Sequence, residues 1–126
     1  MDVADIRSSP YQVFLGIQLR GADPQAVEMF LPYRHEFLRQ DGSDWLHGGI
    51  ISALIDIAGN YAVQARVGPG VATVDMRVDY LRPCRGDLTA TATVVKLGKS
   101  IALSDVSVHD ANCDLVAVGR ACYRVP

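Results

Sequence analysis

The sequence has little of what marks membrane or nucleic-acid-binding proteins. No apolar run approaches the ~20 residues that a transmembrane helix requires. The net charge of −2 provides no basic surface for nucleic acid. The first ten residues, MDVADIRSSP, are polar and acidic, unlike a signal peptide. We therefore expect a cytoplasmic protein that binds neither nucleic acid nor membrane.

Cysteine and histidine are also scarce. The 3 cysteines are widely spaced and form no CxxC pair, so a disulfide framework is not expected. The 3 histidines show neither HxH nor HExxH spacing, which argues against a metal site. We therefore expect a protein that works without a metal or an added cofactor.

The length and composition are those of one ordinary globular domain. The chain has 126 residues, of which 49% are hydrophobic and 21% charged. This length supports one core but not two, so residues 1–126 are expected to form a single domain.

Turn residues divide the first half of the chain into short elements and one long helix. Ser8 or Ser9 can cap a short helix that starts at Pro10 and ends at Gly16. Two extended segments, 16–19 and 26–31, are joined by the turn GADP, and a polar loop covers 34–45. The long helix is expected from His47 to about Arg66, where Gly68-Pro69-Gly70 ends it.

The second half of the chain predicts an antiparallel meander. Alternating apolar and polar residues, separated by turn signals, give four strand-like runs at 71–81, 87–96, 100–109 and 115–125. A helix that is apolar on nearly all of its surface must be shielded from water by other elements. We therefore expect an α+β fold in which an antiparallel sheet wraps around one long central helix.

The long helix carries one narrow polar stripe, formed by Ser52, Asp56 and Asn60 at intervals of four residues. Small residues, among them Gly49 and Gly59, flank this stripe and leave room for a thin ligand. A glycine inside a helix costs roughly 0.5–1 kcal/mol relative to alanine. Close approach of another backbone or of a ligand would explain Gly59.

The segment HGGIISALID places Asp56 nine residues after His47. A carboxylate in an apolar helix loses much of its water and becomes available as a base or nucleophile. The glycines suit a helix start, where free N–H groups can bind an oxygen that gains negative charge. Without the glycines, a purely structural aspartate would be equally well supported.

Three segments, in this order and spacing, match one known family. They are HGGIISALID, the strand VATVDMRVDYLRP, and the final pair of strands in LGKSIALSDVSVHDANCDLVAVGRACYRV. Together they resemble the hotdog-fold thioesterases, specifically the PaaI-like acyl-CoA thioesterase family, over about residues 15–125. The resemblance implies a hotdog fold and the hydrolysis of acyl-CoA to free acid and CoA.

The resemblance also implies roles for individual residues. The family's helix aspartate attacks the thioester or acts as general base, which points to Asp56. The amide of the first glycine polarises the thioester carbonyl, which points to Gly48, and Thr73 matches a hydroxyl residue that places the water or the carboxylate. His47 is expected to shape the helix start through hydrogen bonds rather than to shuttle protons.

Substrate-binding roles are expected at Gly49, Asn60, Arg82 and the turn Gly98-Lys99-Ser100. The turn resembles the segment that lines the family's CoA channel, and Arg82 or Lys99 could reach a CoA phosphate. Three of these residues have a simpler alternative. Asn60 could make only a local polar contact, and Arg82 and Lys99 could be solvated side chains. Family active sites span a dimer interface, which implies a homodimer or homotetramer.

One loop position departs from the family pattern. The family usually has Asn or Gln six residues before the histidine and Gly three before it, whereas this chain has Asp41 and Asp44. If the loop carries a two-residue insertion, Arg39 or Gln40 fills the polar role and Gly42 matches the glycine.

Two other functions remain open at this point. The first is a non-catalytic acyl-CoA-binding protein. The second is a hotdog dehydratase or hydratase, which usually pairs a histidine with an acid across the interface. The second is less well supported, because Ile50 follows HGG and no histidine occurs between Asp56 and His109. The acyl group, aryl or medium-chain, also remains open.

Overall fold

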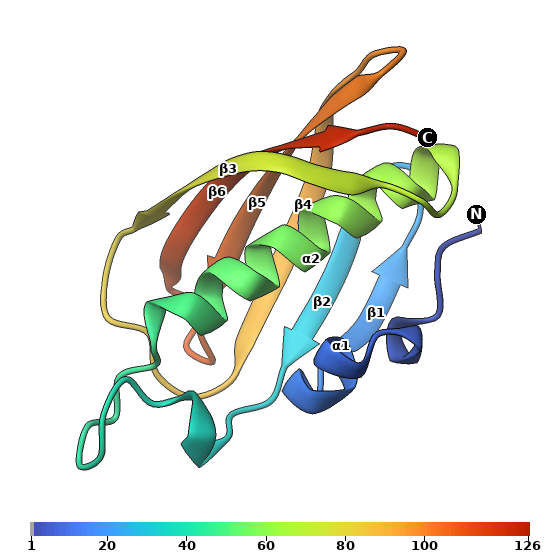
Figure 1. Cartoon of the computed structure of the whole chain (residues 1–126). Coiled ribbons are helices and arrows are strands. Elements are labelled where there is room, and N and C mark those ends of the chain that lie inside the picture. Colours follow the sequence, from blue (N-terminus) through green and yellow to red (C-terminus); the bar gives the residue numbers. More distant parts are fainter. Residues whose placement is uncertain (1) are drawn as a thin grey trace.

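A six-stranded antiparallel sheet curves around one long helix, α2 (Gly48–Val67), in the computed structural model (Figure 1). The structure describes residues 2–126. The strands are β1 (Gln18–Ala22), β2 (Val27–Leu31), β3 (Ala72–Tyr80), β4 (Leu88–Leu97), β5 (Ile101–His109) and β6 (Leu115–Arg124). A short helix, α1 (Pro10–Leu15), precedes them. This arrangement confirms the expected hotdog fold.

The strand order, β1-β2-β4-β5-β6-β3, puts β3 at one edge of the sheet. β3 pairs with β6 along one side only, so its other side presents backbone N–H and C=O groups to the surroundings. β3 directly follows α2 in sequence and crosses in front of the helix in Figure 1. The edge strand therefore lies beside the helix face that carries the predicted site.

The core lies between α2 and the concave face of the sheet. Leu54, Ile55 and Ala58 on the helix are fully buried. Small residues on β4, Ala90 and Ala92, face them and let the helix approach the sheet closely. Burial of a side chain such as leucine or isoleucine stabilises the fold by about 1.5–3 kcal/mol. This contact explains why the helix is apolar on most of its surface.

The first strand differs from the prediction. β1 begins at Gln18 and continues through Ala22, so Gly21 and Ala22 belong to the strand and not to a turn. Gly16 ends α1 as predicted, with a left-handed φ of 75° that glycine adopts at no steric cost. The register between β1 and β2 shifts between Leu19 and Gly21, and a bulge of this kind accounts for a glycine inside a strand.

The predicted loop at 34–45 also contains local structure. A single 3-10 turn spans His35–Phe37, and an isolated bridge joins Leu38 to Leu46. Phe37 is buried and its carbonyl accepts a hydrogen bond from the His47 N–H at 2.7 Å. These contacts fix the direction in which the chain enters α2.

Candidate active site

The site begins at the first turn of α2. His47 is the N-cap residue, and its Nδ1 accepts a hydrogen bond from the Gly49 N–H at 2.9 Å. Gly48 is the first helical residue, so its N–H has no acceptor within the helix. Its carbonyl accepts a hydrogen bond from the Tyr80 hydroxyl at 2.9 Å, which holds the helix start against the end of β3.

A groove of about 580 Å³ opens beside Gly48. Arg39, Trp45 and Arg82 contribute to its walls. The Arg39 guanidinium lies 4.8 Å from the centroid of the Trp45 ring, close enough for a cation–π contact. Gly48 therefore sits in a hollow with two arginine side chains.

The polar loop residues before the histidine take different positions. Of Arg39, Gln40 and Asp41, Arg39 is the one that lines the groove beside Gly48. Asp41 lies 4.0 Å from His35, and Asp44 pairs with Arg85 at 2.9 Å. Within this chain, neither aspartate contributes a free carboxylate to the groove.

Asp56 lies two turns further along α2 and is held from two strands. The Thr73 hydroxyl, near the start of β3, donates to Oδ1 of Asp56 at 2.6 Å. The Tyr123 hydroxyl, on β6, donates to the backbone carbonyl of Asp56 at 2.8 Å. Thr73 and Tyr123 are partners in the β3–β6 register. The structure thus brings together Asp56 and Thr73, both singled out from the sequence.

The carboxylate of Asp56 is less buried than the apolar helix suggests. The residue is half-buried and lines a groove of about 270 Å³ between α2 and the N-terminal segment. Ser8, Gln12 and Asn60 also line this groove. The exposure follows from the fold, because this side of α2 faces the edge strand and the N-terminal segment rather than the centre of the sheet.

Asn60 is engaged in local polar contacts. Its Nδ2 donates to the Val71 carbonyl, and its Oδ1 accepts from Nε2 of Gln64, both at 2.8 Å. Oε1 of Gln64 in turn accepts from the Ala4 N–H at 2.8 Å. The network ties the N-terminal segment, α2 and the start of β3 together around the Asp56 groove. Within this chain, Asn60 therefore makes local polar contacts, which was the alternative to a role in substrate binding.

The glycine at position 59 makes room for a side chain, and not for the backbone or ligand expected from the sequence. A Cβ atom at this position would overlap the Tyr123 hydroxyl. Glycine therefore admits Tyr123 to the surface of the helix. Tyr123 itself was not among the predicted site residues, and the interior glycine was the only sequence signal that pointed to it.

The predicted site residues fall into separate groups within one chain. Gly48 and Asp56 are eight residues apart on the same helix, which places them ~12 Å apart along its axis. Arg82 lies with Gly48, whereas Thr73 lies with Asp56. Because a thioester carbonyl is only a few ångströms across, one chain cannot direct both groups at the same carbonyl.

The turn Gly98-Lys99-Ser100 forms a third group, at the tip of the β4–β5 hairpin that projects beyond the sheet in Figure 1. The Gly98 N–H donates to the Ile101 carbonyl, and the Ser100 carbonyl accepts from the Val125 N–H, both at 2.9 Å. Lys99 is exposed, and the turn lines a groove of about 310 Å³. The backbone of the turn is thus fixed while its cation faces outward.

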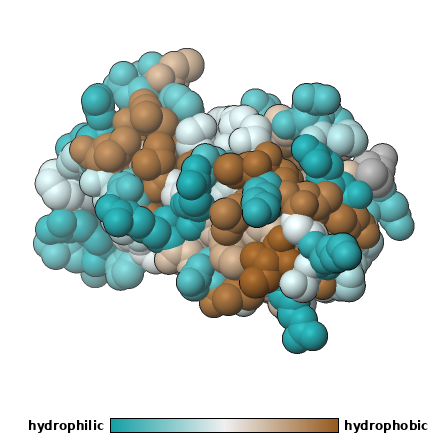
Figure 2. Space-filling view, turned by 90° about the horizontal axis from the view of Figure 1, so that it is seen from above, coloured by the Kyte–Doolittle hydropathy of each residue, from teal (hydrophilic) through white to brown (hydrophobic). Residues whose placement is uncertain are grey.

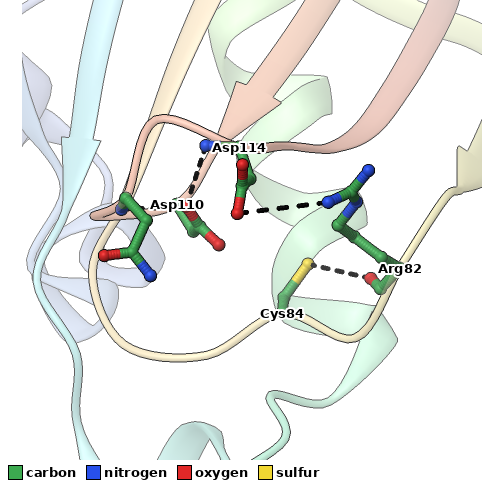
Figure 3. Close-up of polar contacts among 5 residues, drawn as sticks. Arg82, Cys84, Asp110 and Asp114 are labelled. Atoms are coloured by element: carbon green, nitrogen blue, oxygen red, sulfur yellow. Dashed lines mark hydrogen bonds and ion pairs between the residues drawn. The ribbon is translucent and has the colours of Figure 1, made fainter.

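Arg82 and Cys84 lie close to an acidic turn between β5 and β6 (Figure 3). The Arg82 guanidinium is 4.0 Å from the Asp114 carboxylate, so a substrate phosphate would compete with this carboxylate. Burial raises the pKa of the Cys84 thiol to about 11, and the charge of Asp110 adds to the effect. Cys84 is therefore a protonated thiol near neutral pH and a poor nucleophile.

Apolar side chains are exposed along the edge strand and at the projecting hairpin. They include Val74 and Tyr80 on β3, and Val95, Leu97 and Ile101 at the hairpin. Figure 2 shows apolar patches separated by polar residues on the face seen from above.

Within residues 2–126, no helix has the length and hydropathy needed to cross a membrane. Over the same residues, no group of three or more His, Cys, Asp or Glu side chains could hold a metal ion.

Comparison with known sequences places the chain among the thioesterases. The family model of the thioesterase superfamily matches residues 45–117. A predicted esterase of Halobacterium salinarum is 41% identical in an alignment that covers 89% of this chain and 82% of that protein. The medium/long-chain acyl-CoA thioesterase YigI of Escherichia coli is 26% identical, over 92% of this chain and 85% of that protein.

Solved structures agree with the sequence relatives. A thioesterase superfamily protein superposes with a TM-score of 0.92 at 37% identity, covering 96% of this chain and 92% of that one. A thioesterase of Haemophilus influenzae gives a TM-score of 0.83 at 27% identity, covering 93% of this chain and 82% of the other. The PaaI protein of Escherichia coli, at 23% identity and a TM-score of 0.84 over 94% of this chain and 86% of that one, shares the fold.

Proposed function

The chain belongs to the thioesterase superfamily and is a thioester hydrolase, and we propose that it hydrolyses aryl- or medium-chain acyl-CoA with Asp56 as nucleophile or general base. The observation that carries this proposal is the geometry at Asp56. Its carboxylate is held by a 2.6 Å hydrogen bond from Thr73 and is half-exposed beside a groove. It is both fixed and reachable by a substrate.

The proposed chemistry requires only groups that the chain supplies. In the general-base route, Asp56 takes a proton from water, and the resulting hydroxide attacks the thioester carbonyl carbon. In the nucleophilic route, the carboxylate attacks first, and water then hydrolyses the mixed anhydride. In both, the C–S bond breaks and CoA leaves as a thiolate, which takes up the proton released by the attacking water. The Gly48 N–H and the positive end of α2 stabilise the oxygen that gains negative charge.

The distance between Gly48 and Asp56 favours a site shared between two subunits. Along β3, the Thr73 hydroxyl contacts Asp56 and the Tyr80 hydroxyl contacts Gly48. If two β3 strands pair antiparallel about a two-fold axis, the Thr73 end of one meets the Tyr80 end of the other. Asp56 of one subunit then faces Gly48 of the next, in a homodimer or a homotetramer built from such dimers.

Coenzyme A binding is proposed for the cations near this shared site. Arg82 accompanies Gly48 on one subunit, and Lys99 projects from the hairpin tip. Gly49 and Asn60 continue the line of small and polar residues along α2. A phosphate of CoA would gain a charge-assisted hydrogen bond from either cation. The longer acyl chains named for YigI are one end of the range that the test must cover.

The test is an acyl-CoA panel monitored by thiol release. We expect hydrolysis of at least one aryl- or medium-chain acyl-CoA, unchanged by a metal chelator and lost in Asp56→Asn. Saturable binding of acyl-CoA with no thiol release would identify a non-catalytic binding protein. Formation of an unsaturated or hydrated acyl-CoA without thiol release would identify a dehydratase or hydratase.

A further inference from the structure

Two adjacent strands reach Asp56, one at its side chain and the other at its backbone. Thr73 binds the carboxylate and Tyr123 binds the backbone carbonyl, and these two residues are direct partners in the β3–β6 register. The Tyr123 side chain is completely buried, so its hydroxyl is shielded from water. The side chain and the backbone of Asp56 are thus both tied to the same cross-strand pair.

The carbonyl of Asp56 already lies within a helix, where the N–H four residues later can bond to it. The Tyr123 hydroxyl therefore adds a second hydrogen bond that the helix does not require. Burial raises the pKa of this hydroxyl far above its usual range, and the negative charge of Asp56 adds to the effect. Tyr123 consequently remains a neutral donor and does not exchange protons with the substrate.

This additional bond requires room at the helix surface. The hydroxyl occupies the space where a side chain at position 59 would begin, so glycine is needed there. Gly59 weakens a helix interior by roughly 0.5–1 kcal/mol relative to alanine. The sequence therefore keeps a destabilising residue whose structural effect is to bring Tyr123 into contact with Asp56.

We propose that Tyr123 is a positioning residue for Asp56: its hydroxyl fixes the peptide of Asp56 while Thr73 fixes the carboxylate. This inference rests on the proposed function. The two bonds together set the distance of the carboxylate from β3, and β3 is the strand across which Gly48 of the partner subunit is placed. A displacement of about 1 Å between reacting groups can cost ~10²-fold in rate.

The chain contains a matched control. Ser104 on β5 is also completely buried, and its hydroxyl donates to the carbonyl of Gly59 at 2.9 Å. Ser104→Ala therefore removes the same kind of bond, from a sheet hydroxyl to a carbonyl of α2, three residues beyond Asp56. It leaves both contacts of Asp56 intact.

The experiment compares Tyr123→Phe with Ser104→Ala in steady-state hydrolysis and in thermal melts. Because loosening Asp56 affects orientation and not the pocket walls, we expect Tyr123→Phe to lower kcat about 5–20-fold and to change KM by less than about 2-fold. Ser104→Ala should lower Tm by a similar amount and keep kcat within about 2-fold of the wild type. In an Asp56→Asn background, Tyr123→Phe should have no further effect on the residual rate.

Two results would overturn the inference: a wild-type kcat in Tyr123→Phe, or an equal loss of kcat in Ser104→Ala. Asp56→Asn separates this failure from failure of the proposed function. If Asp56→Asn is inactive while Tyr123→Phe is fully active, only the positioning role is lost. If Asp56→Asn retains the wild-type rate, the proposed function itself is wrong.

Discussion

At the residue scale, Asp56 combines three properties that a base or nucleophile needs. It is held by Thr73, it lines a groove, and no cation lies among its hydrogen-bond partners within residues 2–126. Asp56→Asn keeps the shape of the side chain and removes its charge. We expect kcat to fall by ~10²-fold or more, the scale of a lost general base, with little change in KM.

The same variant should remain folded, because the half-buried carboxylate has no ion-pair partner to leave unpaired. Steady-state kinetics on the best substrate of the panel, together with a thermal melt, measures both effects. A near-normal kcat would contradict the catalytic role. An unfolded Asp56→Asn protein would instead favour a structural role for this aspartate.

We expect a smaller role for Thr73 in the same proposed site. Thr73→Ala removes the hydroxyl that orients the carboxylate but leaves the carboxylate in place, so we expect a loss in kcat below that of Asp56→Asn, about 5–10-fold. Thr73→Ser keeps the hydroxyl and serves as the control. Equal losses in the two variants would show that the methyl group, and not the hydrogen bond, matters.

The sequence indicates some of these residues better than others. Gly48 and Asp56 are recognisable because both belong to one motif with fixed spacing. Tyr123 is 67 residues from Asp56 and bonds to its backbone, and a backbone carbonyl has no residue type to recognise. Such a partner can be identified only from the tertiary structure.

At the element scale, the contact between α2 and β6 is unusually close at Gly59. Alanine is normally favoured over glycine inside a helix by about 1 kcal/mol. Here the added methyl group would overlap the Tyr123 hydroxyl, so we expect Gly59→Ala to destabilise the protein by about 1–3 kcal/mol, the scale of overpacking. Urea unfolding measures the change.

The double variant Gly59→Ala with Tyr123→Phe provides the control for this contact. Removing the hydroxyl relieves the worst overlap, and the nearest remaining ring atom would lie 3.1 Å from the new methyl group. The double variant should therefore be more stable than Gly59→Ala alone. Purely additive losses would show that the overlap is not the cause.

On the outer face of the sheet, Asp105 and Arg120 link β5 to β6. The hydrogen bond from Arg120 lowers the pKa of Asp105 below its usual value. This pair therefore stabilises the folded state above pH ~3.9 and loses that contribution as the pH falls through the lowered pKa. We expect the wild type to lose more stability than Asp105→Asn in thermal melts between about pH 4 and pH 2.

The effect should be small and should shrink in high salt, because both side chains are largely solvent-exposed. Melts at low and at high ionic strength provide the comparison. Identical acid profiles for the wild type and Asp105→Asn would show that this pair contributes nothing to acid stability.

Regular periodicity made most elements predictable. The long helix and the last four strands appear close to their predicted bounds, because alternation along a half-buried strand and an apolar helix surface leave clear patterns. β1 was misplaced because the turn-like residues Gly21 and Ala22 lie within the strand, where a bulge accommodates the glycine. The bulge depends on pairing with β2 and has no separate sequence signal.

At the scale of the whole molecule, the edge strand β3 predicts assembly. The strand is nine residues long, is unpaired along one side and carries the exposed Val74 and Tyr80. We expect a dimer, or a tetramer built from two such dimers, in light scattering at micromolar concentration. A fully active monomer would exclude the shared site. The acyl group is not predictable in the same way, because subunits that meet at β3 would together shape its pocket.

The central claim is that Asp56 of one subunit and the Gly48 N–H of the other hydrolyse one thioester. Gly48→Pro removes this N–H, and proline is well tolerated at the first position of a helix. His47 already has the extended backbone that precedes proline, with a ψ of 137°. Asp56→Asn and Gly48→Pro homodimers should both be nearly inactive.

The most direct measurement is the activity of a purified heterodimer, made by co-expression with two affinity tags, of one Asp56→Asn and one Gly48→Pro subunit. A shared site predicts one intact and one doubly altered site per heterodimer, and hence about half of the wild-type kcat per dimer. If each site were built within one subunit, both sites would be damaged. A heterodimer as inactive as the two homodimers would contradict the account.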